Sequence, residues 1–273
     1  MHLGAHKTAT THFQSVLEAN RHLYHDHSTY VGMEEFRNNV RRTKGGIDFA
    51  SSAPFLNKIK ALSSTLIISE ENLSGETKDI YDALLLYSNL EDRLNDFKRF
   101  TQDFEEVEIW FSVRSMDSFL PSIYCEALRH FPYKSFKEVY GMNYSQTWLR
   151  VIQSICRVFP NSKVNVIRYE NYASALPEVI KRIFGENKNW DYLDDVRPRA
   201  AMNHYACKLM GLGVGCLPAR LSSALTQAVS NALNRNNIGY KFSPFNKKQI
   251  DGFLRIYEKD IKAIGLIERV VVY

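Results

Sequence analysis

The sequence lacks any run of 18 consecutive apolar residues, so we expect no transmembrane helix. Only four of its 273 residues are cysteine, and positions 125, 156, 207 and 216 share no metal-binding or redox spacing. We expect reduced and mostly buried thiols. The N-terminus shows no signal-peptide pattern, because a charged segment occupies it. These absences predict a cytoplasmic protein, with peripheral membrane contact left open.

Dense runs of Lys and Arg are also missing, and the net charge at pH 7 is only +5. We therefore expect no nucleic-acid partner, although a modest positive charge suits an anionic ligand. The eight histidines form no ligand spacing, and no metal site is predicted. A hydrophobic share of 45% in 273 residues is enough for one sizeable core. We expect a single domain over 1–273, with an α/β core at 1–190 and a helical C-terminal portion at 191–273.

The first fourteen residues carry the strongest motif. An apolar start, Met1 to Leu3, breaks at Gly4 and leads through small residues into a helical pattern with Phe13 and Val16 on one face. A strand, a loop and a helix in this order leave the first N–H groups of the helix free to bind an anion. A capped helix with a solvated lysine is the simpler alternative. The residues expected at the anion are His6, Lys7, Thr8, Ala9, Thr10 and Thr11.

This loop resembles the Lys-Thr-Gly-Thr-Thr loop of the sulfotransferases, here written His6-Lys-Thr-Ala-Thr-Thr11. The resemblance implies that residues 6–11 bind the 5′-phosphosulfate end of 3′-phosphoadenosine 5′-phosphosulfate (PAPS), whose product is adenosine 3′,5′-bisphosphate. It also implies that Lys7 acts in catalysis and that no metal is required. The motif is not a Walker A loop, since no Gly precedes Lys7. Ala9 departs from the family glycine and disfavours a positive φ.

A second motif follows the most β-prone stretch, Val107 to Val113. Arg114 ends this predicted strand, and Ser122 lies eight residues on in the next predicted helix. A guanidinium and a hydroxyl placed in this way can converge on one phosphate. The spacing is similar to the element with which sulfotransferases hold the 3′-phosphate of the donor. A structural ion pair of Arg114 is the alternative.

The general base has four candidates. A sulfotransferase needs a base near the acceptor hydroxyl, and Glu70 and Glu71 follow the predicted buried strand Leu66–Ser69. Glu71 matches a family glutamate at this strand end, although acidic residues there also cap helices. His6 and His12 are rivals, because imidazole titrates near neutral pH.

Further short apolar runs at Thr29–Val31 and Val164–Ile167 alternate with helical patterns. This alternation predicts an α/β fold, P-loop-like and three-layered, with a central and mostly parallel sheet flanked by helices. Glu170, which follows the last of these strands, is expected to satisfy nearby backbone or basic groups. A helical cap is predicted to complete the fold at the C-terminus.

The predicted function is therefore transfer of a sulfuryl group from PAPS to an acceptor hydroxyl. The resemblance is closest to bacterial and Golgi-type enzymes, and it implies a saccharide or glycolipid acceptor. The glycine-rich C-terminal donor loop of the cytosolic enzymes is at most a trace at Gly239–Phe242. A P-loop kinase or hydrolase and a non-catalytic nucleotide-binding protein stay open, as does the oligomeric state. Candidate stacking surfaces for the acceptor are Tyr24, Tyr30, Tyr133 and Tyr140.

Overall fold

The computed structural model describes residues 1–41, 43, 47–62, 64–81, 85–141, 146–185, 189–193, 202–213 and 216–273. Its strands are β1 (Ser28–Val31), β2 (Thr65–Ile68), β3 (Glu108–Val113), β4 (Lys163–Arg168) and β5 (Val270–Val272). The helices of the first half are α1 (Thr10–Ala19), α2 (Met33–Asn39), α3 (Phe49–Lys60), α4 (Thr77–Tyr81), α5 (Leu90–Thr101) and α6 (Met116–Ala127). Those of the second half are α7 (Phe136–Tyr140), α8 (Trp148–Val158), α9 (Tyr172–Phe184), α10 (His204–Gly211), α11 (Ala219–Arg235) and α12 (Lys247–Gly265).

All strand pairs between the named strands are parallel, as the alternating pattern predicts. β1 pairs with β2, while β3 pairs with β4 and β4 pairs with β5. The segment Met1–Leu3 joins the two groups, because His2 forms parallel bridges to both Ser69 and Trp110. The spatial order is therefore β1, β2, Met1–Leu3, β3, β4, β5. From Met1–Leu3 the chain passes to the outer strand β1, returns to β2 and then crosses to β3, β4 and β5. The connections therefore leave Met1–Leu3 and β3 in opposite directions, and the strand order reverses at Met1–Leu3.

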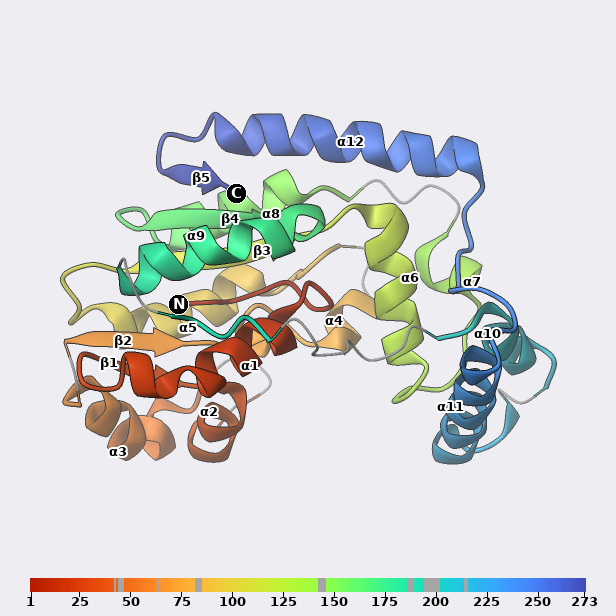
Figure 1. Cartoon of the computed structure of the whole chain (residues 1–273), viewed down its shortest axis with the longest axis horizontal. Coiled ribbons are helices and arrows are strands. Elements are labelled where there is room, and N and C mark those ends of the chain that lie inside the picture. The colour runs from red at the N-terminus through yellow and green to blue at the C-terminus, as the bar shows by residue number, and fades with distance from the viewer. Residues whose placement is uncertain are drawn as a thin grey trace.

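Two hydrophobic clusters cover opposite faces of the sheet. Neighbouring strand residues alternate between them: Tyr30, Ile67 and Trp110 belong to the smaller cluster with α1 and α9. Val31, Ile68 and Phe111 belong to the larger cluster, which includes residues of α5, α6 and α8. Figure 1 shows α1 and α9 on the near side of the strands. The result is a mixed α/β fold with parallel strands flanked by helices.

The C-terminal residues are tied to this core. β5 extends the sheet beside β4, and the α12 residues Tyr257, Ile261 and Ile264 belong to the larger cluster. Asp260 of α12 accepts a hydrogen bond from the Trp148 N–H (2.7 Å) at the start of α8. The C-terminal portion, predicted to be mostly helical, thus also contributes the strand β5. The boundary expected near residue 190 lies beside residues that are not described (186–188 and 194–201).

The helices can also be compared with the thickness of a bilayer. Within the described ranges, no helix combines the length and apolarity needed to cross a membrane.

Candidate functional site

The carboxyl ends of the parallel strands meet at one edge of the sheet, and the predicted site residues follow them. Gly4 follows Met1–Leu3, Glu70 and Glu71 follow β2, and Arg114 follows β3. Ligands of open α/β sheets bind at this edge, where the strand order reverses. The order reverses at Met1–Leu3, so the loop over residues 4–9 lies at the position where a ligand is expected.

This N-terminal loop (residues 4–9) is tightly wound. Its backbone is left-handed at Gly4 (φ 48°), Lys7 (φ 63°) and Ala9 (φ 66°). A Cβ added to Gly4 would stand 2.7 Å from the Thr10 hydroxyl oxygen, so only glycine fits there. Left-handed residues inside a turn direct successive N–H groups toward one point and form an anion-binding concavity. Strain at two non-glycine residues is typical of ligand-binding loops.

The first turn of α1 has free donors. Ala9 precedes the helix and gives it no side-chain cap. Among the described residues, no acceptor binds the N–H groups of residues 9–12. Together with the helix dipole, these groups create a positive site at the N-terminus of α1. The anion interpretation of the motif is therefore favoured over a simple capped helix.

The three threonines differ in what they can donate. The Thr8 hydroxyl donates to the Ala5 carbonyl (2.6 Å), and the Thr10 hydroxyl points to the same oxygen (3.4 Å). Both side chains are buried and stabilise the bend of the loop. Thr11 is exposed, and its hydroxyl has no hydrogen bond within the described residues. Thr11 is thus the threonine whose side chain is available to a ligand.

His6 is buried beneath the loop, with both ring nitrogens occupied. Nδ1 lies 3.1 Å from the Tyr87 hydroxyl, and Nε2 lies 2.9 Å from the Asn72 side-chain oxygen. The backbone N–H of His6 also donates to the Tyr87 hydroxyl (3.1 Å). A neutral imidazole that donates from Nε2 and accepts at Nδ1 satisfies all three contacts. This arrangement favours a role of His6 in fixing the loop.

Lys7 projects its ammonium group toward α6. Its Nζ lies 3.3 Å from Oε2 of Glu126, and the Lys7 side chain remains 30% exposed. Burial raises the pKa of Glu126, but the positive charges of Lys7 and Arg129 outweigh it and hold the pKa below its usual value. The half-exposed Lys7 can exchange this carboxylate for another anion at modest cost.

Arg114 connects β3 to the N-terminal loop. Its Nη1 donates to the Lys7 carbonyl (2.8 Å), and its Nε donates to the Ser118 hydroxyl (2.8 Å). The guanidinium also lies 4.2 Å from the centre of the Tyr169 ring. Burial lowers the pKa of Arg114, although this group stays charged at neutral pH. The structure thus brings the two predicted phosphate-binding elements into direct contact.

Ser122 lies one helical turn beyond Ser118 on α6. It is half-buried, and within the described residues its hydroxyl makes no hydrogen bond. Residues 118, 122 and 126 follow each other at four-residue intervals, so they share one face of the helix. That face carries the contacts to Arg114 and to Lys7. Ser122 is therefore free to act beside Arg114 as predicted.

The base candidates at the β2 end have different surroundings. Glu70 is fully buried and pairs bidentately with Arg37, at 2.7 and 2.8 Å. Glu71 is half-buried, and its carboxylate forms no hydrogen bond or ion pair among the described residues, although the charge of Arg37 acts on it. Its Cβ lies 3.7 Å from a Cβ built on Gly4. His12 is 2.8 Å from the Tyr172 hydroxyl, next to α9. Of the two glutamates, Glu71 is therefore the one whose carboxylate is not engaged in an ion pair with any described residue.

Three further residues reach this site that were not predicted as site residues. Ser118 and Tyr169 contact Arg114, and Lys241 approaches from the C-terminal portion. Partial desolvation lowers the pKa of Lys241, and the positive charges of Arg114 and Lys7 lower it further. Lys241 belongs to the Gly239–Phe242 trace, and its clustering with two other cations favours an anionic ligand. Glu170 accepts from the Ser115 N–H (3.0 Å), which confirms its expected structural role.

The left-handed backbone of Ala9 leads to a stability prediction. An L-residue in this conformation costs about 1–2 kcal/mol, whereas glycine adds about 0.5–1 kcal/mol of unfolded-state entropy. We expect Ala9→Gly to raise the free energy of unfolding by about 0.5–1 kcal/mol, measured by urea denaturation. Ala5→Gly, at a buried loop residue with no positive φ, is the matched control and should destabilise. A loss of stability in both variants would contradict the strain at Ala9.

Two further observations concern metal ligands in the structure and similarity to known proteins. Among the described residues, no group of three or more His, Cys, Asp or Glu side chains is arranged to hold a metal ion. No family model, curated protein or solved structure matches this chain.

Proposed function

We propose that this protein is a sulfotransferase that moves a sulfuryl group from PAPS to an acceptor hydroxyl, most suitably on a saccharide. The observation that carries the proposal is the hydrogen bond from Arg114 to the Lys7 carbonyl. It joins two elements that the resemblance assigns to the two phosphate ends of one donor. The polar groups of the site suit a doubly anionic nucleotide. They are the free amides at α1, the unpaired hydroxyls of Thr11 and Ser122, and the cluster of Lys7, Arg114 and Lys241.

Each residue has a role in this mechanism. The α1 amides and Thr11 would hold the 5′-phosphate, and Arg114 with Ser122 would hold the 3′-phosphate. Lys7 would stabilise negative charge on the bridging oxygen when the sulfuryl group leaves. Glu71, whose carboxylate is free, would accept the proton of the acceptor hydroxyl. The donor supplies the activated sulfuryl group.

The alternative of a P-loop kinase or hydrolase has less support. That chemistry uses Mg²⁺ held by an acidic residue beyond a strand. Glu70 stands at such a position, but Arg37 and the Asn72 N–H occupy its carboxylate oxygens.

Calorimetric titration tests the proposal. We expect adenosine 3′,5′-bisphosphate to bind without metal and more tightly than ADP with Mg²⁺. AMP is the matched control ligand, because it lacks only the 3′-phosphate. Preference for ADP with Mg²⁺ would overturn the sulfotransferase proposal. Metal-independent bisphosphate binding without turnover on any acceptor would leave a non-catalytic nucleotide-binding protein.

A further inference from the structure

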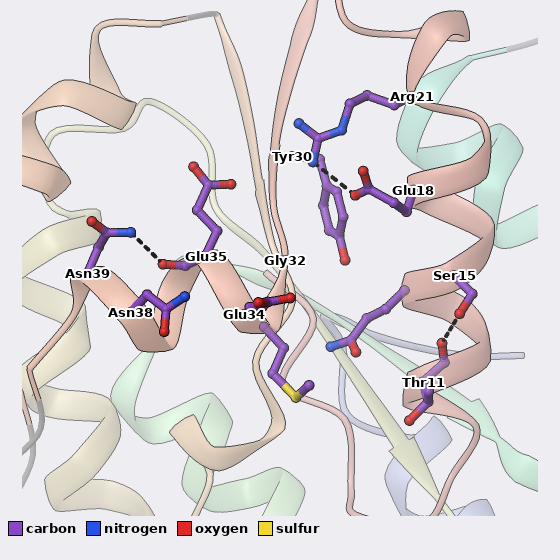
Figure 2. A pocket seen from close by; sticks show the side chains of 12 residues that line it. Thr11, Ser15, Glu18, Arg21, Tyr30, Gly32, Glu34, Glu35, Asn38 and Asn39 are labelled. Atoms are coloured by element: carbon purple, nitrogen blue, oxygen red, sulfur yellow. Dashed lines mark hydrogen bonds and ion pairs between the residues drawn. The ribbon is translucent and has the colours of Figure 1, made fainter. Parts of the chain in front are cut away.

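A cavity of about 580 Å³ lies beside the candidate site, between α1 and α2. It lies at the carboxyl end of β1, where Tyr30 and Gly32 belong to its lining. Figure 2 shows side chains of α1 on one side, side chains of α2 on the other and Tyr30 between them. This volume is in the range that holds small organic ligands.

Tyr30 provides an unused polar group in the cavity. The residue is only 4% exposed, yet within the described chain its hydroxyl makes no hydrogen bond. A Cβ at residue 32 would stand 3.1 Å from this hydroxyl, so Gly32 keeps the space beside it open. Burial raises the pKa of Tyr30, so the phenol remains protonated and can donate. Because no described protein group occupies this hydroxyl, it is available to a ligand in the cavity.

The charges of the cavity are mainly negative. Glu18 pairs with Arg21 at 2.9 Å and is neutralised. Glu34 and Glu35 line the same cavity, and within the described residues neither carboxylate has an ion-pair partner. Arg21 also interacts electrostatically with Glu35, so these three glutamates and one arginine leave the lining with a net charge of −2. A net negative charge repels a phosphate or a polyanionic chain and attracts an ammonium group.

The remaining polar groups suit a polyhydroxylated ligand. Gln14 donates to the Ser69 carbonyl (3.1 Å) and keeps its side-chain oxygen as an acceptor. Asn38 lines the opposite wall, and no hydrogen bond of its amide is found among the described residues. Amides and a phenol offer donors and acceptors together, which matches hydroxyl groups that also donate and accept.

We propose that this cavity binds an amino sugar, a saccharide that carries positively charged amino groups, as the acceptor of the transfer. The acceptor role rests on the proposed function, because Thr11 belongs both to the cavity lining and to the predicted donor-binding residues. Gln14 adds a second connection, since it reaches Ser69 next to the glutamates at the β2 end. The cavity thus adjoins the site that would deliver the sulfuryl group.

Calorimetry with three trisaccharide probes tests the inference: a glucosamine trimer, its N-acetylated form and a galacturonic acid trimer. We expect the glucosamine trimer to bind most tightly and the uronic acid trimer least. Tyr30→Phe should weaken the glucosamine trimer about tenfold without lowering the unfolding midpoint, because it removes a hydroxyl that has no partner. Glu35→Gln should reduce the preference for the amine over the N-acetyl form several-fold.

Tyr24→Phe is the matched control. Tyr24 belongs to the same cluster, but its hydroxyl donates to the Leu17 carbonyl (2.8 Å) and lies outside the cavity lining. This variant should lose stability and keep its trisaccharide affinity. Equal binding of all three probes, preference for the uronic acid, or unchanged affinity in Tyr30→Phe would overturn the inference.

Titration of adenosine 3′,5′-bisphosphate into the same samples separates the two proposals. Bisphosphate binding without binding of the glucosamine trimer defeats the acceptor inference alone. Trimer binding that depends on Tyr30, without bisphosphate binding, supports the sugar site and defeats the proposed transfer.

Discussion

Lys7→Met is expected to lower the rate of sulfuryl transfer by about 10²–10³-fold, the usual cost of losing one preorganised group that stabilises transition-state charge. The ammonium of Lys7 pairs with Glu126 and is partly exposed, so it contributes little to stability. Its main effect arises when negative charge develops on the bridging oxygen. We therefore expect a large loss of rate with a much smaller loss of bisphosphate affinity. The rate is measured as bisphosphate released from PAPS in the presence of a mixture of saccharide acceptors.

Two variants control for this result. Lys163→Met removes an exposed lysine at the amino end of β4, whereas the candidate site lies at the carboxyl ends of the strands. Lys163 pairs with Glu106, and its replacement should leave the rate unchanged. Glu126→Gln removes the partner of Lys7 and should also retain activity, because the ammonium remains in place. If Lys7→Met loses rate and affinity in equal proportion, Lys7 binds the donor and does not act on the transition state.

The strands that the sequence predicted are those with continuous apolar runs. Val107–Val113 and Val164–Ile167 correspond to β3 and β4, because a strand buried on both faces needs apolar side chains at nearly every position. β5 was missed, because it is the last element and no helical pattern follows it, so the alternation of strands and helices does not mark it. The central position of Met1–Leu3 was equally invisible, since strand order depends on long-range pairing.

The candidate site shows the same division between local and long-range information. Lys7, Thr11 and Arg114 could be found because turns and strand ends are local features with fixed chemistry. Lys241 lies in the Gly239–Phe242 trace but was not predicted as a site residue, because its approach to Arg114 depends on how the C-terminal portion returns to the core.

One expectation from the sequence, the stacking of an acceptor on tyrosine rings, changes for a related reason. The predicted stacking surfaces on Tyr24, Tyr30 and Tyr140 are buried, at 2%, 4% and 6% exposed. Of these, Tyr30 lines the cavity between α1 and α2. Residue type alone does not determine which part of an aromatic side chain faces solvent.

Arg114→Lys is expected to weaken binding of adenosine 3′,5′-bisphosphate by about 100-fold, which equals about 2.7 kcal/mol. Hydrogen bonds to charged groups contribute about 1.5–3 kcal/mol, and lysine cannot reproduce the planar fork of arginine. Nη1 of Arg114 donates to the Lys7 carbonyl, and its Nε donates to the Ser118 hydroxyl. The guanidinium also lies over the ring of Tyr169. Nη2 has no hydrogen-bond partner among the described residues and is the group available to a phosphate.

AMP distinguishes the two roles that this geometry allows. If Arg114 binds the 3′-phosphate, Arg114→Lys should remove most of the advantage of the bisphosphate over AMP and leave AMP affinity nearly unchanged. If Arg114 only holds the N-terminal loop in place through its hydrogen bond to the Lys7 carbonyl, the affinity for both nucleotides should fall by the same factor. Ser122→Ala, one turn along α6, should reduce the bisphosphate advantage less strongly and without loss of stability, because its hydroxyl supports no other described group. Ser118→Ala should act through Arg114 and reduce the bisphosphate advantage with AMP affinity nearly unchanged, since it removes the contact that orients the guanidinium.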